Sequence, residues 1–287
     1  MAIHRFSLSR AAITSLTIAG LAACSEKVPD MNDVNPEGQS WRSSMSNQVL
    51  QINEEVLALR APANPDRNAY FGDLHVHTAY SFDAYAFGTI ATPYDAYRYA
   101  KGEPLQHPSG YEVQLQQPLD FYAVTDHAMF MGVIKESADT STEFSKTAVA
   151  QPLHNINASD NYGQLSILGR SQAFATFIPG MLKGLLDGSI DEKQAESITR
   201  SAWLDSINAA DEFNQPGKFT TFAAYEYTSS TDERGNLHRN VIFRGTERLP
   251  AVPFSRFHSQ NPEGLWDWMD GLREQGVESL AIPHNSN

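Results

Sequence analysis

Histidine and carboxylate side chains recur along the chain in a spacing that suits metal ions. His75 and His77 are two residues apart, so on a β-strand both imidazoles project from one face and can share a metal ion. Glu226 stands among aromatic and alanine residues, where burying an unpaired carboxylate would be costly and a metal ion would remove that cost. With residues near the ends of other expected strands, these give the candidate metal ligands His75, His77, Asp83, His127, Glu226, His238 and His284.

Other interpretations of the same region stay open. A single His-x-His pair also occurs as two surface or core histidines, and Glu226 could form a salt bridge with Arg239 or Arg244 instead. These two arginines flank the fourth expected strand and are candidate phosphate clamps, although exposed arginines at a strand edge are the simpler interpretation. We expect Asp73 and Asp126 to accept hydrogen bonds from ligand imidazoles rather than to bind metal directly.

The elements that must position these residues follow an α/β pattern. Hydrophobic periodicity predicts five strands, at 70–78, 119–125, 219–227, 238–243 and 279–284. It also predicts helices at 93–99 and 262–275, and a largely helical insertion at 130–216 with helices at 172–186 and 191–213. Most candidate ligands lie at strand ends, where parallel α/β barrels carry their functional residues. We therefore predict one main domain over residues 69–287.

The first 23 residues have the features of an export signal. Two arginines precede an apolar run at 11–21 that is too short to span a membrane, and small residues follow it. The run ends in Leu21-Ala22-Ala23-Cys24, which resembles the lipobox of bacterial lipoproteins, whose cysteine is lipidated. We expect an exported protein anchored by lipid at Cys24, and Ser25 favours the outer membrane, facing the periplasm. An ordinary secretory signal with a chance cysteine is the alternative.

The composition narrows the chemistry further. Residues 24–68 are rich in Asn, Ser, Pro and Glu and predict a disordered tether. Cys24 is the only cysteine, so the chain can form no internal disulfide and has no other thiol nucleophile. The formal net charge of -13 disfavours nucleic acid as a partner. The sequence also lacks a Gly-x-Ser-x-Gly elbow, a phosphate loop and a dinucleotide-binding glycine pattern, which leaves metal-dependent chemistry.

The ordered motifs resemble those of the PHP (polymerase and histidinol phosphatase) superfamily. They are the run from His75-Val76-His77 to Asp83, then Thr125-Asp126-His127, Glu226, His238 and Pro283-His284-Asn285. The segments Phe71-Gly72-Asp73-Leu74-His75 and Glu226-Tyr227-Thr228 are most similar to its bacterial branch called domain of unknown function 3604. The resemblance spans roughly residues 70–287 apart from the insertion, and several motifs in one order are more specific than any single one.

The resemblance implies a partial, distorted (β/α)7 barrel that binds two or three divalent metal ions (Zn, Mn or Fe) and hydrolyses phosphoesters. It implies three ligand pairs, with Glu226 bridging the first two: His75 with His77, His238 with His284, and Asp83 with His127. A metal-bound hydroxide would attack a small phosphorylated substrate. Amide or lactone hydrolysis on a similar barrel, and a non-catalytic lipid-anchored protein that binds metal or another ligand, are the alternatives. The oligomeric state is left open.

The chain also looks incomplete at its C-terminus. The superfamily's late Asp-x-His motif has no counterpart before Asn287, and five expected strands are fewer than the roughly seven or eight of a closed barrel. We therefore expect an open barrel whose fifth strand has an exposed edge, although Leu280 and Ile282 in that strand predict a buried setting. Such a chain alone is expected to have weak activity or none.

Overall fold

The computed structural model describes residues 68–159, 167–231 and 235–284. The export signal, Cys24 and nearly all of the expected tether lie outside these ranges, so those interpretations stay predictions. The described residues all belong to one unit of the chain, Asn68–Asn287. None of the described helices combines the length and the apolar character that crossing a membrane requires.

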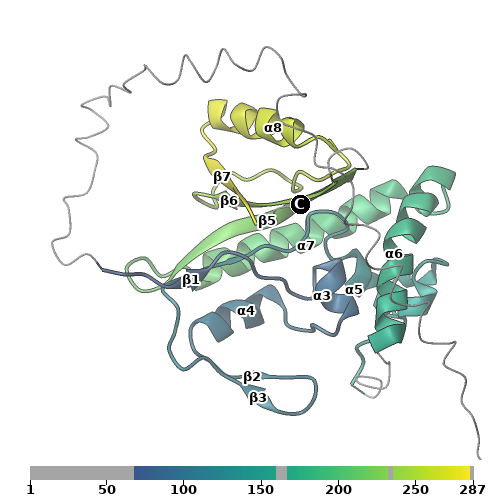
Figure 1. Ribbon diagram of the computed structural model, residues 1–287, viewed down its shortest axis with the longest axis horizontal. Helices are drawn as coiled ribbons and strands as arrows, with labels where there is room; N and C mark the ends of the chain where they lie inside the picture. Colours follow the sequence, from purple (N-terminus) through teal and green to yellow (C-terminus); the bar gives the residue numbers. More distant parts are fainter. Residues whose placement is uncertain (1–67, 160–166, 232–234, 285–287) are drawn as a thin grey trace, which may run out of the picture. The chain divides into compact units, whose positions relative to one another are not determined.

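The fold is built on a five-stranded sheet that curls into a half-barrel (Figure 1). In spatial order its strands are β1 (Gly72–Asp73), β4 (Phe121–Val124), β5 (Thr220–Thr231), β6 (Gly235–Phe243) and β7 (Ser279–Pro283). β1, β4 and β5 run parallel, whereas β6 is antiparallel to both of its neighbours. The C-terminal ends of β1, β4, β5 and β7 therefore share one edge of the sheet with the start of β6.

This sheet bears on the predicted barrel in two respects. β5 and β6 pair antiparallel, so β6 runs against the other strands, and the described residues form a half-barrel that does not by itself confirm a (β/α)7 barrel. The first strand is also shorter than the predicted 70–78, because β1 ends at Asp73. After Asp73 the chain still contacts the residue that follows β4. Thr125 N donates to Val76 O at 2.7 Å, and Val76 N donates to Thr125 Oγ1 at 2.9 Å.

The described part of the chain contains six α-helices around this sheet. They are α3 (Phe82–Ala86), α4 (Pro93–Ala100), α5 (Val133–Ala138), α6 (Ile167–Asp187), α7 (Glu192–Phe213) and α8 (Pro262–Glu274). α4 begins as the sequence predicts: Thr92 and Asp95 form a capping box that satisfies two free N–H groups, and Pro93 occupies the first turn. Smaller elements are the hairpin of β2 (Leu105–Gln106) and β3 (Glu112–Val113), and 3-10 helices at Phe144–Lys146 and Gln151–Leu153.

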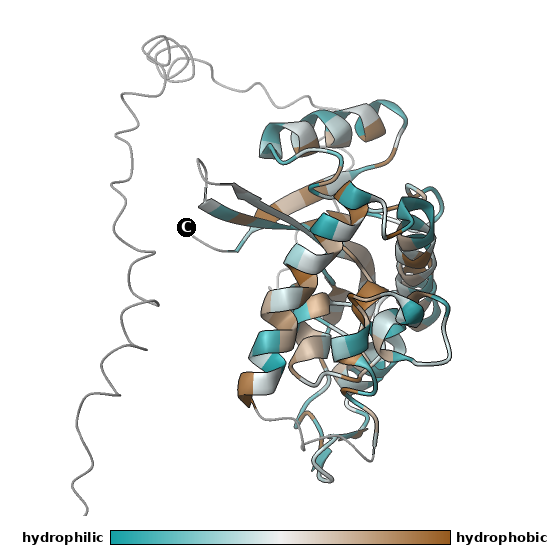
Figure 2. Cartoon of the chain, turned by 90° about the vertical axis from the view of Figure 1, so that its right-hand side faces the viewer, coloured by the Kyte–Doolittle hydropathy of each residue, from teal (hydrophilic) through white to brown (hydrophobic). Residues whose placement is uncertain are grey.

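One face of the sheet is covered by helices. Tyr225 and Tyr227 of β5 point to this face and pack with Trp203 of α7 and Leu265 of α8. Figure 1 shows α7 lying alongside β5, and Figure 2 shows hydrophobic residues alternating with hydrophilic ones along the helices. Within residues 130–159 and 167–216 lie α5, α6 and α7, so the described parts of this segment are largely helical. The helical layer thus fixes β5 from one side and leaves its other side chains pointing to the opposite, inner face.

The inner face carries polar residues and a small apolar cluster. Leu74 and Ile242 belong to that cluster, and Asn240 Nδ2 donates to Leu74 O at 2.7 Å, which links β6 to the chain after β1 across the curl. Leu280 and Ile282 of β7 are 53% and 37% exposed, so the buried setting predicted for this strand is wrong. Among the described residues β7 pairs only with β6, so no described strand lies along its other edge.

A close approach between α5 and α7 gives a test of this packing. Gly132 has φ +77°, and a Cβ added to it would lie 2.7 Å from Ala202 Cβ. We predict that Gly132→Ala lowers the free energy of unfolding by about 2 to 4 kcal/mol, because backbone strain and overlap add. Gly188→Ala, at φ +76° with open space around it, should cost only about 1 to 2 kcal/mol from strain. Urea unfolding measures both, and equal losses would contradict the tight contact.

Candidate metal centre

The seven candidate ligands meet at the shared edge of the sheet. His75 and His77 follow β1, Asp83 lies in α3, His127 follows β4 and His284 follows β7. Glu226 and His238 come from the interiors of β5 and β6, where strand alternation points both to the inner face. Because β6 runs antiparallel, its early residue His238 reaches the same edge as the late residues of the other strands. Residues far apart in the sequence are thereby brought into contact.

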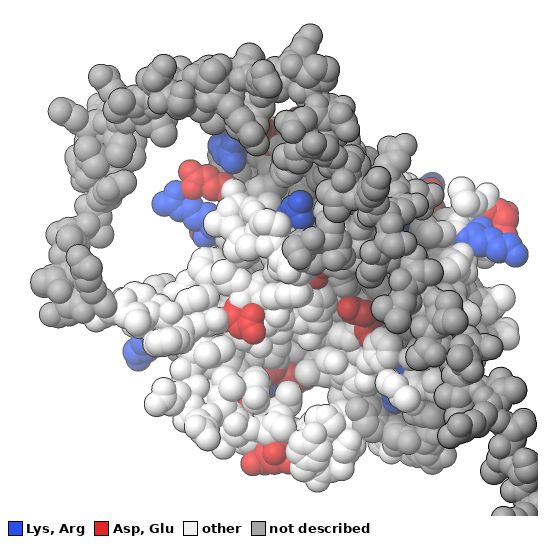
Figure 3. All heavy atoms as spheres, viewed as in Figure 1, with Lys and Arg blue, Asp and Glu red and all other residues white. Residues whose placement is uncertain are grey.

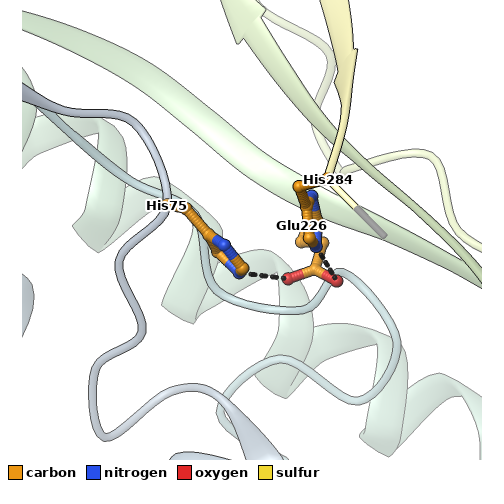
Figure 4. Close-up of side chains that lie close together, drawn as sticks. All are labelled: His75, Glu226 and His284. Atoms are coloured by element: carbon orange, nitrogen blue, oxygen red, sulfur yellow. Dashed lines mark ion pairs between the residues drawn. The ribbon is translucent and has the colours of Figure 1, made fainter. Parts of the chain in front are cut away.

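Glu226 is the centre of this cluster. Its Oε2 lies 2.9 Å from His77 Nε2 and 3.5 Å from His75 Nε2. Its Oε1 lies 3.3 Å from His284 Nε2, 3.4 Å from His127 Nδ1, and in contact with His238 Nδ1. Figure 4 shows His75 and His284 directed at the two oxygens of the carboxylate. One buried carboxylate is thus approached by five imidazoles.

The ligand atoms form two groups that share Glu226. Those of His75, Glu226 and His284 all lie within 4.8 Å of one another, and so do those of His77, His127 and Glu226. Asp83 adjoins the second group, with Oδ2 3.3 Å from His127 Nε2 and Oδ1 3.7 Å from His77 Nδ1. A shared Glu226 agrees with the bridging role that the resemblance implies. The implied pairs are also adjacent. His75 Nε2 lies 3.0 Å from His77 Nε2, and both face Glu226 Oε2. His238 and His284 both face Oε1, and Asp83 lies beside His127.

The electrostatics of the cluster keep its carboxylates charged. Burial alone would raise the pKa of Glu226, but the contacts with His238 and His77 hold it well below its usual range. Burial likewise opposes ionisation of Asp83, yet His127 and His77 lower its pKa well below normal. Two carboxylates that stay ionised at neutral pH are suited to balance divalent cations.

The imidazoles respond in two different ways. Burial lowers the pKa of His75 and His284 by more than the charge of Glu226 raises it. Burial would also lower the pKa of His77, but its contact with Glu226 and the nearby charge of Asp83 raise it instead. His75 and His284 are therefore disposed to be neutral, the form in which histidine binds metal.

Hydrogen-bond partners behind the imidazoles were missed by the sequence analysis. His127 Nδ1 lies 2.6 Å from Thr228 Oγ1, which in turn lies 3.5 Å from Glu226 Oε1. The short contact with Thr228 orients the His127 ring, whichever of the two atoms donates. Asn236 Oδ1 accepts from His238 Nε2 at 2.9 Å, which leaves the lone pair of His238 on Nδ1. The only signal in the sequence was their position: Thr228 is two residues after Glu226, and Asn236 is two residues before His238.

The donor set passes a test for bound cations. The lone pair of a neutral His238, assigned from its hydrogen bond to Asn236, faces Glu226 Oε1, and acceptors that face each other repel unless a cation or a proton lies between them. Within the described part of the chain, buried Glu226 Oε2 and His284 Nδ1 receive no well-directed hydrogen bond. Nitrogen and oxygen donors of this kind suit Zn, Mn and Fe. The residues therefore fit a metal centre.

The two flanking aspartates do not act as the sequence suggested. Asp73 Oδ1 accepts from the backbone N of His75 at 2.9 Å. Asp126 accepts from Thr78 N at 2.5 Å and from Thr78 Oγ1 at 2.6 Å, and its complete burial raises its pKa to about 6. Both carboxylates therefore hold the chain that carries the His-x-His pair, and neither accepts from an imidazole N–H in these hydrogen bonds. The spacing of a motif could not distinguish these two roles.

The arginines expected as phosphate clamps lie elsewhere. Arg239 adjoins His238 on β6, so strand alternation turns it to the opposite face, and its Nη1 donates to His238 O at 2.7 Å. Arg244 follows the far end of β6, with Nη1 2.5 Å from Glu278 Oε2. Neither arginine pairs with Glu226. On the face shown in Figure 3, the described basic side chains are scattered among acidic ones.

Comparison with known proteins places the chain in a family. The family model described as protein of unknown function (DUF3604) matches residues 64–287. The chain belongs to this family. The match includes every candidate ligand of this DUF3604 protein, from His75 to His284. Searches of curated proteins and of solved structures found no match.

The central position of Glu226 predicts a large effect on metal content. Glu226→Gln removes a charge that both ligand groups share, so metal affinity should fall by more than about 100-fold. That loss is larger than the loss of affinity expected when a residue only orients ligands. Elemental analysis after loading with Zn²⁺ and desalting measures the loss. Glu196→Gln is the matched control, because Glu196 is exposed and paired with Arg200 at 2.9 Å. Equal metal content in the two variants would contradict the assignment.

Proposed function

We propose that this DUF3604 protein is a metal-dependent hydrolase of phosphoesters. The observation that carries the proposal is the buried carboxylate of Glu226, shared by two groups of metal-binding atoms. The order of the motifs, which resembles that of the PHP superfamily, supports phosphoesters as the substrate class. The substrate would be a small phosphorylated molecule.

The residues would divide the binding of the metal ions between them. His75 and His284 with Glu226 would hold one ion, and His77 and His127 with Glu226 would hold a second. Asp83 lies beside the second group and could complete it or help to bind a third ion. His238 contacts Glu226 Oε1 and would add a nitrogen ligand to either ion. Two adjacent divalent ions would supply a water of lowered pKa and would neutralise charge on a phosphoryl group.

The side chains of the centre would also orient the substrate. His75 is the most exposed of the five imidazoles at Glu226, with 44% of its side chain accessible, so the centre is open to solvent on that side. Glu226 and His127 are almost completely buried and would hold their positions during the reaction. A substrate would therefore approach on the side of His75, while the buried carboxylate of Glu226 would hold the ions from the interior of the protein.

Turnover by the metal-loaded protein tests this function. We predict weak but measurable metal-dependent hydrolysis of p-nitrophenyl phosphate or bis(p-nitrophenyl) phosphate, lost with a chelator and regained with Zn²⁺ or Mn²⁺. Glu226→Gln should reduce kcat/KM by more than about 100-fold, whereas His258→Ala should change it little, because His258 is an exposed loop residue whose Nδ1 accepts from Ser255 N. Turnover of p-nitrophenyl acetate or a lactone alone would favour the alternative hydrolase, and metal binding without any turnover would favour a binding protein.

We also propose that the protein is exported and anchored by lipid at Cys24, with the outer membrane, facing the periplasm, as its location. The support is the lipobox-like sequence that ends the apolar run at 11–21. Labelled palmitate fed to expressing cells should enter the wild-type protein and not a Cys24→Ser variant, and the variant should leave the membrane fraction. Unchanged membrane association of Cys24→Ser would contradict this anchor.

A further inference from the structure

Ser81 occupies a position where serine usually has a different task. It is the N-cap residue of α3, and an N-cap serine normally accepts a hydrogen bond from an N–H of the first helical turn. The Ser81 side chain makes no such cap, and Ala84 N donates to Asp83 Oδ1 at 2.7 Å instead. Ser81 is also completely buried. Capping therefore does not explain why a hydroxyl is placed here.

The Ser81 hydroxyl connects three parts of the metal centre. Its Oγ donates to Asp83 Oδ1 at 2.8 Å, accepts from the backbone N of His127 at 3.3 Å, and lies 2.6 Å from His77 Nδ1. A hydroxyl has a single proton, and we assign it to the contact with Asp83, because an ionised carboxylate can only accept, so that Oγ accepts from His77 Nδ1–H. The lone pair of a neutral His77 is then on Nε2, the atom that lies 2.9 Å from Glu226 Oε2.

We propose that Ser81 is a positioning residue for the metal ion of the group formed by His77, His127 and Glu226. The inference rests on the proposed metal centre and adds to it a selective role. One hydroxyl sets the tautomer of His77, orients the carboxylate of Asp83 and holds the backbone at His127. In the group of His75, Glu226 and His284, the two histidines follow β1 and β7, and neither is among these hydrogen-bond partners of Ser81. Ser81 should therefore govern one of two ions and not the other.

Titration of the metal-free protein with Co²⁺, followed by calorimetry and by the visible absorption of the bound ion, tests this role. Wild-type protein should bind in two steps. In Ser81→Ala, one step should weaken by roughly 10- to 100-fold, as for other residues that orient metal ligands, and the other should be little changed. The Co²⁺ spectrum of the weakened step should also change, because His77 and Asp83 lose their fixed orientation.

Two further variants separate this role from a loss of stability. Ser137 is also completely buried, and its hydroxyl donates to Val133 O at 2.7 Å within α5, so Ser137→Ala is a matched control that should leave both steps unchanged. Ser81→Thr keeps the hydroxyl and should restore the weakened step. Equal weakening of both steps in Ser81→Ala, unchanged binding in that variant, or the same loss in Ser81→Thr would overturn the inference.

A measurement on the unchanged protein covers the case in which Ser81→Ala does not fold. The ¹⁵N chemical shifts of the His77 ring in Zn²⁺-loaded protein report which nitrogen bears the proton. A proton on Nδ1, slowed in exchange by its hydrogen bond to Ser81, supports the role, and a proton on Nε2 overturns it. Wild-type protein that binds no metal at all would overturn the metal centre itself, an outcome distinct from two intact binding steps that do not depend on Ser81.

Discussion

The buried, ionised carboxylate of Glu226 is the constraint around which this molecule is arranged. An isolated charge in a protein interior is strongly unfavourable, so its surroundings must supply positive charge or protons. Five imidazoles contact it, and the hydrogen bond behind His238 directs the lone pair of its neutral form toward the carboxylate. Protons on the imidazoles or bound cations would balance the charge. The cluster is therefore better understood as one electrostatic unit than as separate residues.

The sheet supplies the precision that this unit requires. β5 is the longest strand and is held between β4 and β6, so Glu226 is fixed by pairing on both sides. Tyr225 and Tyr227, the neighbours of Glu226, are anchored in the helix-covered face, which prevents rotation of the strand. Asn240, the cross-strand partner of Glu226, ties β6 to the chain after β1. Rigid elements thus surround the one residue whose displacement would disturb both ligand groups.

Much of this arrangement could be predicted from local patterns. Periodicity located four of the five strands and the long helices, and His-x-His with the strand-end histidines identified the residues that meet at Glu226. Alternation alone could also have excluded Arg239, because it is the neighbour of His238 on one strand. The roles of Ser81 and Thr228 could not be predicted, since serine and threonine are common and their hydroxyls matter only through contacts made in three dimensions. The direction of β6 could not be predicted from its own residues, because alternation puts the same side chains on one face whichever way a strand runs.

The wide spacing of the ligands along the chain has a consequence for how the protein matures. Residues 75 and 284 come together only when β1 and β7 both occupy the curled sheet, so no unfolded or half-synthesised chain offers the complete set of ligands. Capture of ions would then be coupled to folding. An ion held by His75 and His284 would close a loop of about 210 residues, and one held by His77 and Glu226 would close a loop of about 150. The ions would stabilise the folded chain according to their free concentration where folding finishes. The metal supply of that compartment, not the ligand set alone, would decide which ion the protein carries.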